Sequence, residues 1–393
     1  MVVRSLRLYN FRNYAVQEIQ LPTGLVALTG DNGQGKTNLL EALCVLATTK
    51  SPLVDRDREL IRWSQNEARI AAEIELSAGR GDRRTLEYGW RNEGAAIVRE
   101  MRAGGVPQSA ITHWLGQLQV VAFFPHDLAL ITGDPSERRR FLNLELGKAR
   151  PAHFADATRY RRALQQRNAL LRLIAEGRAG RPPSVPLPPG ESFGTLAEWN
   201  RQVITYGSRI LAQRAHFLSE LQPLLSDVHR KLSGQDEIFT VEYAAGVKIR
   251  ASEGANANWS QSFASALEAD HEIDTRRGTT QSGPHRDDLI FKLGEMDLRR
   301  YGSQGQQRLA VLALKVALAH WVTQATGEPP VLLLDDALSE LDATRRSRLL
   351  EEATCFPQSV LTATDPKFLS EVPAALFSVT AGRVTALSTA APE

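Results

Sequence analysis

The sequence predicts an α/β fold in which a compact head is joined to a mainly helical second lobe. Two segments typical of one site, a glycine-rich loop at 30–37 and an acidic strand end at 330–336, are separated by helical periodicity over 126–274. Since one crossover connection needs far fewer residues, the helical stretch is interpreted as an insertion. We therefore expect a head formed by residues 1–125 and 275–393, and a helical arm formed by residues 126–274.

The composition is typical of a soluble globular protein. The chain has 393 residues, of which 42% are hydrophobic, enough to bury the cores of two or three structural units. Its 47 basic and 45 acidic residues leave a net charge of +2, so a nucleic-acid surface would require local clustering of arginines. Cys44 and Cys355 lack metal-ligand spacing and suit a reducing compartment. No run approaches ~18 apolar residues, so we expect a cytoplasmic protein without a membrane partner.

Residues 30–37 match the P-loop pattern of glycine, four residues and Gly-Lys-Thr. A short apolar strand is expected before the loop and a helix after it, and this context argues against an ordinary glycine-rich turn. Backbone N–H groups at the helix start would bind phosphate, Lys36 would reach the β and γ phosphates, and Thr37 would contact Mg²⁺. The residues predicted to bind ATP are Gly30, Asp31, Asn32, Gly33, Gln34, Gly35, Lys36, Thr37 and Asn38.

The N-terminal region is expected to form strands that lead into the P-loop. Alternating apolar residues over 3–9 and 16–21 predict a hairpin, and the same alternation over 69–102 predicts a mostly antiparallel sheet. The polar segment Asn10–Tyr14 between the first two strands is either near the nucleotide or a plain loop, and the sequence leaves both open.

The second chemical segment is Pro330–Asp336, a buried-strand pattern that ends in two carboxylates, as in a Walker B motif. Asp335 would hold the Mg²⁺ that Thr37 also contacts. Asp336 would orient or deprotonate the attacking water, and is the predicted catalytic residue together with Lys36. Taken alone, the two aspartates could belong to a solvated turn, but the P-loop favours the catalytic interpretation.

The intervening stretch is expected to form a helical arm rich in arginine and leucine. Helical periodicity covers 136–142 and 155–175 and resumes over 196–232, with too few heptads for a long coiled coil. The proline-rich stretch 180–190 would be its exposed tip. Its arginines are candidate DNA phosphate contacts, or else a solvated helix face. These candidates are Arg138, Arg139, Arg140, Arg159, Arg161, Arg162 and Arg167.

Several segments resemble those of a known family. Ser303-Gln304-Gly305-Gln306 resembles the signature motif of ABC-type ATPases, and Ser339-Glu340-Leu341-Asp342 resembles their D-loop. Three longer segments, 135–142, 283–288 and 303–308, resemble the hallmark segments of the RecF family of recombination mediators. The resemblance covers nearly the whole chain, and the proline-rich stretch resembles an insertion relative to the family.

The resemblance implies an ATP-dependent homodimer in which the signature of one chain acts in trans on the nucleotide of the other. Its residues would be Ser303, Gln304, Gly305 and Gln306, with Ser339 and Asp342 in the D-loop. It further implies binding of gapped DNA and, with RecO and RecR, loading of the recombinase in recombinational repair, replication restart and the SOS response. The alternatives are an SMC-like chromosome organiser, which a long heptad arm would favour, and an ABC-type subunit of a nuclease complex.

Departures from the wider ABC pattern imply slow hydrolysis used as a switch. Pro125-His126-Asp127 stands where transporter ATPases carry a Q-loop glutamine, and Thr362–Asp365 where they carry a switch histidine. Asp336 is shorter than the glutamate that many ABC enzymes use. His285 with Asp287 and Asp288 could suggest a metal site, but one imidazole without ligand spacing argues against it.

Overall fold

The computed structural model describes residues 1–77, 82–94, 96–177, 194–248, 258–369 and 372–387. It contains two compact units, which we call the head and the helical unit and describe separately. The head consists of Met1–Ile131, Pro223–Phe239 and Leu293–Glu393, and the helical unit of Thr132–Gln222 and Thr240–Lys292. These boundaries differ from the predicted ones, because residues 126–131 and 223–239 belong to the head and residues 275–292 to the helical unit. The predicted tip at 180–190 lies outside the described residues.

The first sheet of the head is antiparallel and has the order β2-β1-β4-β5-β6-β7. Its strands are β1 (Val2–Phe11), β2 (Tyr14–Gln20), β4 (Glu67–Glu75), β5 (Arg83–Asn92), β6 (Ile97–Ala103) and β7 (Val106–Pro107). Alternate residues of β4 and β5 are buried, which is why the sequence alternates there. The antiparallel sheet predicted for this region is therefore present.

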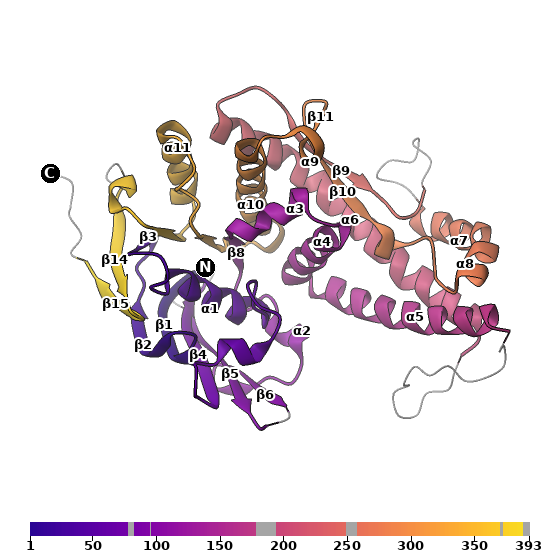
Figure 1. Ribbon diagram of the computed structural model, residues 1–393, viewed down its shortest axis with the longest axis horizontal. Helices are drawn as coiled ribbons and strands as arrows, with labels where there is room; N and C mark the ends of the chain where they lie inside the picture. The colour runs from indigo at the N-terminus through magenta and orange to yellow at the C-terminus, as the bar shows by residue number, and fades with distance from the viewer. Residues whose placement is uncertain (78–81, 95, 178–193, 249–257, 370–371, 388–393) are drawn as a thin grey trace. The chain divides into compact units, whose positions relative to one another are not determined.

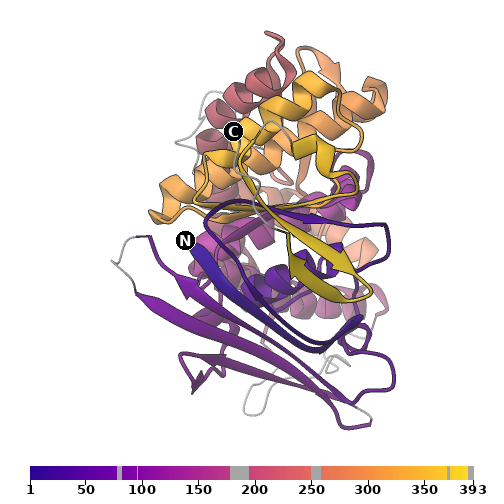
Figure 2. The same cartoon turned by 90° about the vertical axis from the view of Figure 1, so that its left-hand side faces the viewer.

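The second sheet of the head has the order β15-β14-β3-β13-β12-β8 and is parallel except at β15 (Figure 2). Its strands are β3 (Gly24–Thr29), β8 (Val120–Phe123), β12 (Val331–Leu334), β13 (Gln358–Ala363), β14 (Ala374–Thr380) and β15 (Arg383–Ala386). Strand β12 is buried throughout and β13 also, as expected for a parallel sheet covered on both faces. The carboxyl ends of β3, β12 and β13 therefore meet at one edge.

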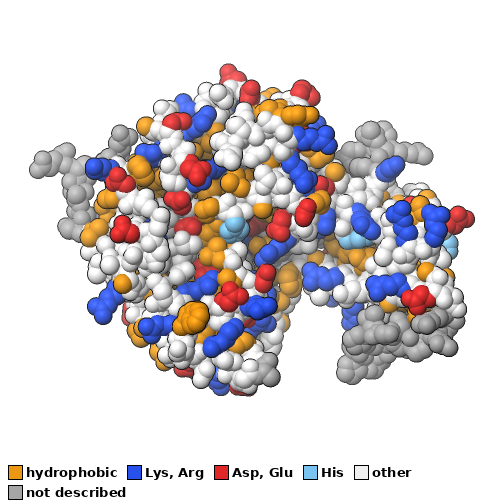
Figure 3. Space-filling view, in the orientation of Figure 1, with side chains coloured by type: hydrophobic (Ala, Val, Ile, Leu, Met, Phe, Trp, Pro, Cys, Tyr) orange, Lys and Arg blue, Asp and Glu red, His pale blue; other side chains and the backbone are white. Residues whose placement is uncertain are grey.

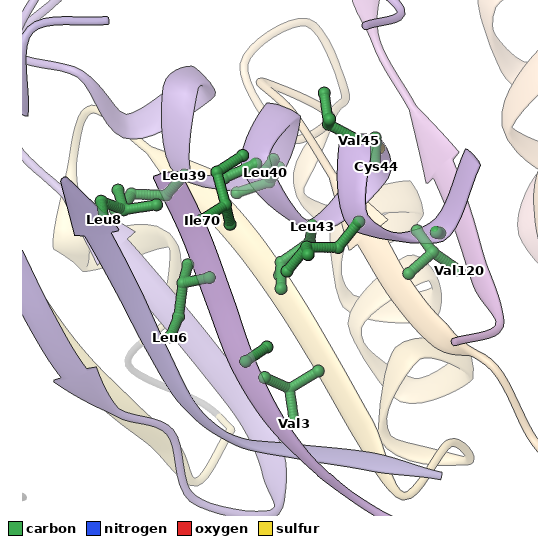
Figure 4. Close-up of a cluster of buried hydrophobic side chains, with 14 of the residues drawn as sticks. Val3, Leu6, Leu8, Leu39, Leu40, Leu43, Cys44, Val45, Ile70 and Val120 are labelled. Atoms are coloured by element: carbon green, nitrogen blue, oxygen red, sulfur yellow. The ribbon is translucent and has the colours of Figure 1, made fainter. Parts of the chain in front are cut away.

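The core of the head includes helix α1 (Lys36–Thr48), which packs its apolar face against both sheets (Figure 4). Leu39, Leu40 and Leu43 of α1 belong to the same buried cluster as Leu6 of β1 and Ile70 of β4. Burial of each such side chain contributes roughly 1.5–3 kcal/mol. This packing fixes the helix that begins directly after the P-loop.

Helix α10 (Gln304–Thr326) is the second core helix of the head, and α9 (Leu298–Tyr301) precedes it. By length and hydropathy α10 could span a membrane, but 72% of its apolar window is buried inside the protein. That burial is the property of a core helix. The remaining long helix of this region is α11 (Ala343–Thr354).

The helical unit is built around two long helices (Figure 1). Its helices are α4 (Pro135–Ala149), α5 (Pro151–Ala175), α6 (Leu196–Ser233, up to Gln222), α7 (Trp259–Ala269) and α8 (His271–Arg277). Tyr160 of α5, Val203 of α6 and Phe263 of α7 share one hydrophobic cluster. Strands β9 (Phe239–Ala244) and β10 (Asp288–Leu293) of this unit are neighbours in a small sheet, and β11 (Met296–Asp297) lies among the residues of the head. The predicted α/β head with a mainly helical second lobe is thus confirmed.

Candidate functional site

The P-loop connects β3 to α1 and has glycine at two positions where a Cβ atom would meet a neighbour, the backbone of Val379 at one and the side chains of Asn13 and Tyr14 at the other. Gly30 has φ +141°, and a Cβ atom there would lie 2.3 Å from the carbonyl oxygen of Val379 in β14. Gly35 has φ +114°, and its Cβ would lie 2.6 Å from the Asn13 amide nitrogen. Both positions combine a left-handed φ with a steric limit, so glycine is needed at each. The loop is thereby fixed between β14 and the N-terminal turn.

Lys36, the first residue of α1, has its ammonium group at the P-loop backbone. It donates to the carbonyl oxygens of Gly30 at 2.5 Å and Asp31 at 2.8 Å, and the residue is 7% exposed. Burial lowers the pKa of Lys36, while the nearby carboxylates of Asp335, Asp336 and Asp31 oppose that shift. The cation therefore lies within the loop that the sequence assigned to phosphate binding.

Thr37 and Asp335 lie 298 residues apart in sequence and are in direct contact. The Thr37 hydroxyl is 3.0 Å from Asp335 Oδ1 and 3.1 Å from Oδ2. Burial raises the pKa of Asp335, and hydrogen bonds from Thr362 and Thr37 oppose the shift. Mg²⁺ prefers hard oxygen ligands and usually takes one or two from the protein, the rest from phosphates and water. A hydroxyl and a carboxylate at this separation fit that requirement.

Asp336, the second residue after β12, has a left-handed backbone with φ +49°. Its N–H donates to the Thr362 hydroxyl at 2.9 Å, and its carbonyl accepts from Arg308 and from Ser339 Oγ at 3.2 Å. A non-glycine residue in this region carries strain and persists because its surroundings hold it. Arg308 also forms a 2.8 Å ion pair with Glu340, so α10 and the D-loop segment both support this turn.

The N-terminal turn supports the P-loop from the other side. The Asn13 amide donates to the carbonyl of Gln34 at 2.9 Å and accepts from the Asn38 amide at 2.9 Å. The Tyr14 hydroxyl donates to the carbonyl of Gly35 at 3.0 Å. Sequence reasoning left this turn open between a plain loop and a site segment, and alternation alone gave no further signal.

The signature segment lies at the start of α10. Ser303 is the N-cap residue, and its hydroxyl accepts from the Gln306 N–H at 3.3 Å while Gln306 Oε1 accepts from the Ser303 N–H at 2.9 Å. Ser303, Gln304 and Gly305 are exposed, and a Cβ at Gly305 would meet nothing within 4 Å. A rigid, exposed helix N-terminus of this kind can accept an anion. In the D-loop segment, Asp342 caps α11 by accepting from the Arg345 N–H at 2.9 Å.

The segment that replaces the Q-loop glutamine links β8 to α10. Asp127 Oδ2 accepts from the Phe124 N–H at 2.8 Å, and Oδ1 accepts from Lys315 at 2.9 Å. Lys315 is buried in the middle of α10. The carboxylate thus ties the strand end to the signature helix, a role that the sequence did not indicate.

The arginines predicted to contact DNA fall into a buried group and an exposed group. Arg138 is 1% exposed and pairs with Asp288 at 2.5 Å, and Arg167 is fully buried and pairs with Asp274 at 2.7 Å. Neither guanidinium is accessible to a DNA phosphate, so the expectation that Arg138 and Arg167 contact DNA is wrong. Arg139 is half-buried and donates to the Asp287 carbonyl at 2.9 Å. Those still at the surface are Arg140, Arg159 and Arg161, with Arg162 half-buried.

The hallmark segment 283–288 forms a buried polar network in the helical unit. The Asp287 carboxylate accepts from Arg214, from the Tyr243 hydroxyl and from the Gly246 N–H, the last at 2.7 Å. His285 contacts the Tyr160 hydroxyl at 2.7 Å and the Thr280 carbonyl at 3.0 Å. These side chains therefore hold α5, α6 and β9 to one another.

Taken together, the P-loop, the acidic strand end on the same sheet and the serine-capped helix define a class of protein, the ABC-type P-loop ATPase head. Comparison with known proteins supports this class. The head domain of SMC in a structure with the C-terminal winged-helix domain of ScpA has a TM-score of 0.55 at 14% identity, covering 99% of this chain and 98% of that chain. At that identity the likeness concerns the fold alone.

Closer similarity identifies the family. The family model described as RecF/RecN/SMC N terminal domain matches residues 2–385. The "DNA replication and repair protein RecF" of Synechococcus sp. is 38% identical over 364 residues, covering 93% of this chain and 91% of the relative. The protein of the same name from Chloroflexus aurantiacus is 39% identical over 380 residues, covering 93% and 94%. A solved structure of "the recombination mediator protein RecF-ATP in RecFOR pathway" has a TM-score of 0.84 at 28% identity, covering 98% and 97%. The chain belongs to the RecF family.

Proposed function

We propose that this protein is an ATP-dependent recombination mediator of the RecFOR type. The observation that carries the proposal is the 3.0 Å contact between Thr37 of the P-loop and Asp335 of the Walker B strand. It brings the two halves of a nucleotide site together across the inserted helical unit. The solved relative is a recombination mediator protein described as RecF-ATP in the RecFOR pathway, which supports ATP as the nucleotide.

The site has the groups required for slow ATP hydrolysis. The P-loop N–H groups and Lys36 would bind the phosphates, and Thr37 with Asp335 would hold Mg²⁺, which would supply positive charge against the phosphate oxygens. Asp336 orients or deprotonates the attacking water. Its shorter side chain and its anchored backbone give it less reach than a glutamate, so hydrolysis is slow and serves as a switch.

The active species is an ATP-bridged dimer. Ser303 and Gly305 lie at an exposed helix N-terminus, where a partner's γ-phosphate can bind. In a symmetric pair each P-loop faces the partner's signature, so two ATP molecules hold the chains together. Hydrolysis removes that bridge and releases the dimer.

The dimer acts on gapped DNA in the cytoplasm and, with RecO and RecR, helps to load the recombinase in recombinational repair, replication restart and the SOS response. Apart from the buried Arg167, helix α5 carries four arginines and one aspartate, which supports a phosphate-binding role for the helical unit. On the face shown in Figure 3, basic side chains predominate over acidic ones around α5 and α8. The longest described helix has 38 residues, which does not favour the chromosome-organiser alternative.

Mixing two inactive variants tests this function. Ser303→Arg leaves the P-loop intact but places a bulky cation where the partner's phosphate must lie, so it should bind ATP without dimerising. Lys36→Met removes the phosphate-binding cation. In a mixed dimer one site regains an intact Lys36 facing an intact Ser303, so partial ATPase recovery is expected. No recovery in a demonstrated heterodimer contradicts completion in trans, and Ser136→Arg, at another exposed helix-start serine, is the matched control.

Asp336→Asn separates binding from hydrolysis. The amide keeps the shape of the side chain but cannot accept a proton, so ATP affinity should persist while turnover falls about 10²–10⁴-fold. ATP-bound dimer should then accumulate, as measured by light scattering. Normal turnover would show that Asp336 is not the residue that orients the water.

A further inference from the structure

Thr362, near the end of β13, contacts both Walker B aspartates, although neither the P-loop nor the Walker B pattern includes it. Its hydroxyl is 2.9 Å from Asp335 Oδ1 and 2.9 Å from the backbone nitrogen of Asp336. Thr362 is 2% exposed. It occupies the segment where transporter ATPases carry their switch histidine. The sequence therefore indicated only that the histidine is missing here and gave no role for the threonine.

The hydrogen bonds of Thr362 have one possible direction. The Asp336 N–H can only donate, so the hydroxyl oxygen accepts from it. The single hydroxyl proton is then left for the Asp335 carboxylate, which accepts it. Because β12 and β13 are parallel neighbours with Leu334 opposite Leu361, Thr362 follows as the next residue beside Asp335. The sheet register therefore fixes this bridge.

Two threonine hydroxyls hold the Asp335 carboxylate from opposite parts of the chain, Thr37 from α1 and Thr362 from β13. If Thr37 held Mg²⁺, its hydroxyl oxygen would be engaged by the metal, and its contact with Asp335 would be weakened. The bond from Thr362 involves no group that touches phosphate and persists. Because the bond from Thr362 goes to Asp335 Oδ1, Oδ2 would remain to help hold Mg²⁺.

We propose that Thr362 is a positioning residue that fixes Asp335 for Mg²⁺ and supports the strained Asp336 backbone for hydrolysis. The proposal rests on the proposed ATPase function and deepens it. Asp336, at φ +49°, is held at its N–H by Thr362 and at its carbonyl by Arg308 and Ser339. Loss of the hydroxyl leaves a buried N–H unpaired and frees the carboxylate to rotate. Metal affinity and turnover should both suffer, while phosphate binding by the P-loop should not.

Thr362→Val tests the hydroxyl, because valine retains the shape and the β-branching. Binding of a fluorescent ATP analogue is measured with EDTA and across a Mg²⁺ titration. Metal-free affinity should stay within about twofold of wild type, while the Mg²⁺ concentration for half-maximal effect should rise about 10–100-fold, the range seen when groups that orient metal ligands are removed. In steady state kcat should fall with little change in KM. Thr362→Ser, which restores the hydroxyl, should recover both properties.

Thr364→Val is the matched control, since Thr364 is exposed two residues away on the same segment. A Thr362→Val protein with wild-type Mg²⁺ dependence overturns the proposal. So does a serine variant as defective as the valine variant, because the methyl group and not the hydroxyl would then matter. If valine prevents folding, the serine variant and Thr362→Ala are compared in the same titration. Failure of the ATPase function itself is distinguished by Lys36→Met, which would then leave nucleotide binding unchanged.

Discussion

The nucleotide site of the head and the polar network of the helical unit are both built from short, polar, glycine-containing segments. In the head these segments are partly exposed, whereas in the helical unit the polar network is buried. In the head, Ser303 and Gly305 remain exposed at a helix start, and the P-loop keeps its shape through backbone contacts. In the helical unit, Asp287 is fully buried and its carboxylate is satisfied by Arg214, Tyr243 and the Gly246 N–H.

The difference shows what hallmark segments encode. Exposed donors at a helix N-terminus can meet a ligand, because desolvation occurs only when the ligand binds. Buried charges that satisfy one another cannot, because exposing either one leaves the other unpaired in a low-dielectric environment. Both kinds of segment are short and polar, and burial distinguishes them. The four predictions below test this contrast, in order of decreasing effect.

The largest effect is expected for Asp287→Asn. The amide leaves the buried Arg214 guanidinium without its counter-charge, so the free energy of unfolding should fall by about 3–5 kcal/mol. Urea unfolding followed by far-UV circular dichroism measures the change. Glu18→Gln, in an exposed ion pair with Arg7, should cost at most about 1 kcal/mol. ATP affinity of the folded Asp287→Asn protein at low temperature should be unchanged. A lower ATP affinity would show that the nucleotide site depends on the buried network of the helical unit.

The next largest effect is a loss of folding stability at acid pH, which depends on His153 of the helical unit. Burial lowers the pKa of His153 from its ordinary value of 6.5 to about 4, only partly offset by its hydrogen bond with Gln213. Between these values the unfolded chain binds a proton that the folded chain does not. Stability is therefore lost as the pH falls from 6.5 to about 4, by about 3 kcal/mol in total.

Hydrogen exchange of α5 amides, corrected for intrinsic rates, checks this loss. His153→Gln cannot titrate and should show a smaller decrease in protection below pH 6.5. His216, which is exposed, supplies the control through His216→Gln, expected to follow wild type. An identical acid response in the His153 and His216 variants would contradict the role of burial.

A third test returns to the head. Lys36→Met should weaken ATP binding about 100-fold, equivalent to ~3 kcal/mol, because a charge-assisted hydrogen-bond donor to the phosphates is lost. Thermal stability should change little, since the ammonium donates its hydrogen bonds to carbonyls of its own loop. Isothermal calorimetry measures the affinity. Lys36→Arg keeps the charge but not the shape and shows how much of the loss is geometric.

The features that the sequence predicted are those formed by contiguous residues, and the features that it missed depend on contacts between distant segments. The P-loop was predictable because strand, glycines and helix are contiguous, and Asp335 because a buried strand ending in carboxylates has one usual use beside a P-loop. Thr362 and Asn13 were not, because their contacts depend on the order of β3, β13 and β12 and on the N-terminal turn. Burial divides Arg138 from Arg140, although the two arginines are adjacent on one predicted helix.

The smallest effect is expected at the surface of the helical unit, where the arginines that remain exposed are proposed to contact DNA phosphates. Arg140, Arg159 and Arg161 are replaced together by alanine. Each lost phosphate contact should flatten the dependence of log affinity on log salt by about 0.9, with similar weakening for every DNA sequence. The slope is measured with gapped duplexes by fluorescence anisotropy across a range of salt concentrations.

A matched triple variant separates local contacts from total charge. Arg7, Arg83 and Arg91 of the head are also exposed, but each forms an ion pair with a glutamate on the sheet. Their replacement by alanine removes the same number of positive charges and should leave the salt slope unchanged. If both triple variants flattened the salt dependence to the same extent, net charge alone would drive binding. A slope changed only by the head variant would place the DNA surface on the antiparallel sheet and not on α4 and α5.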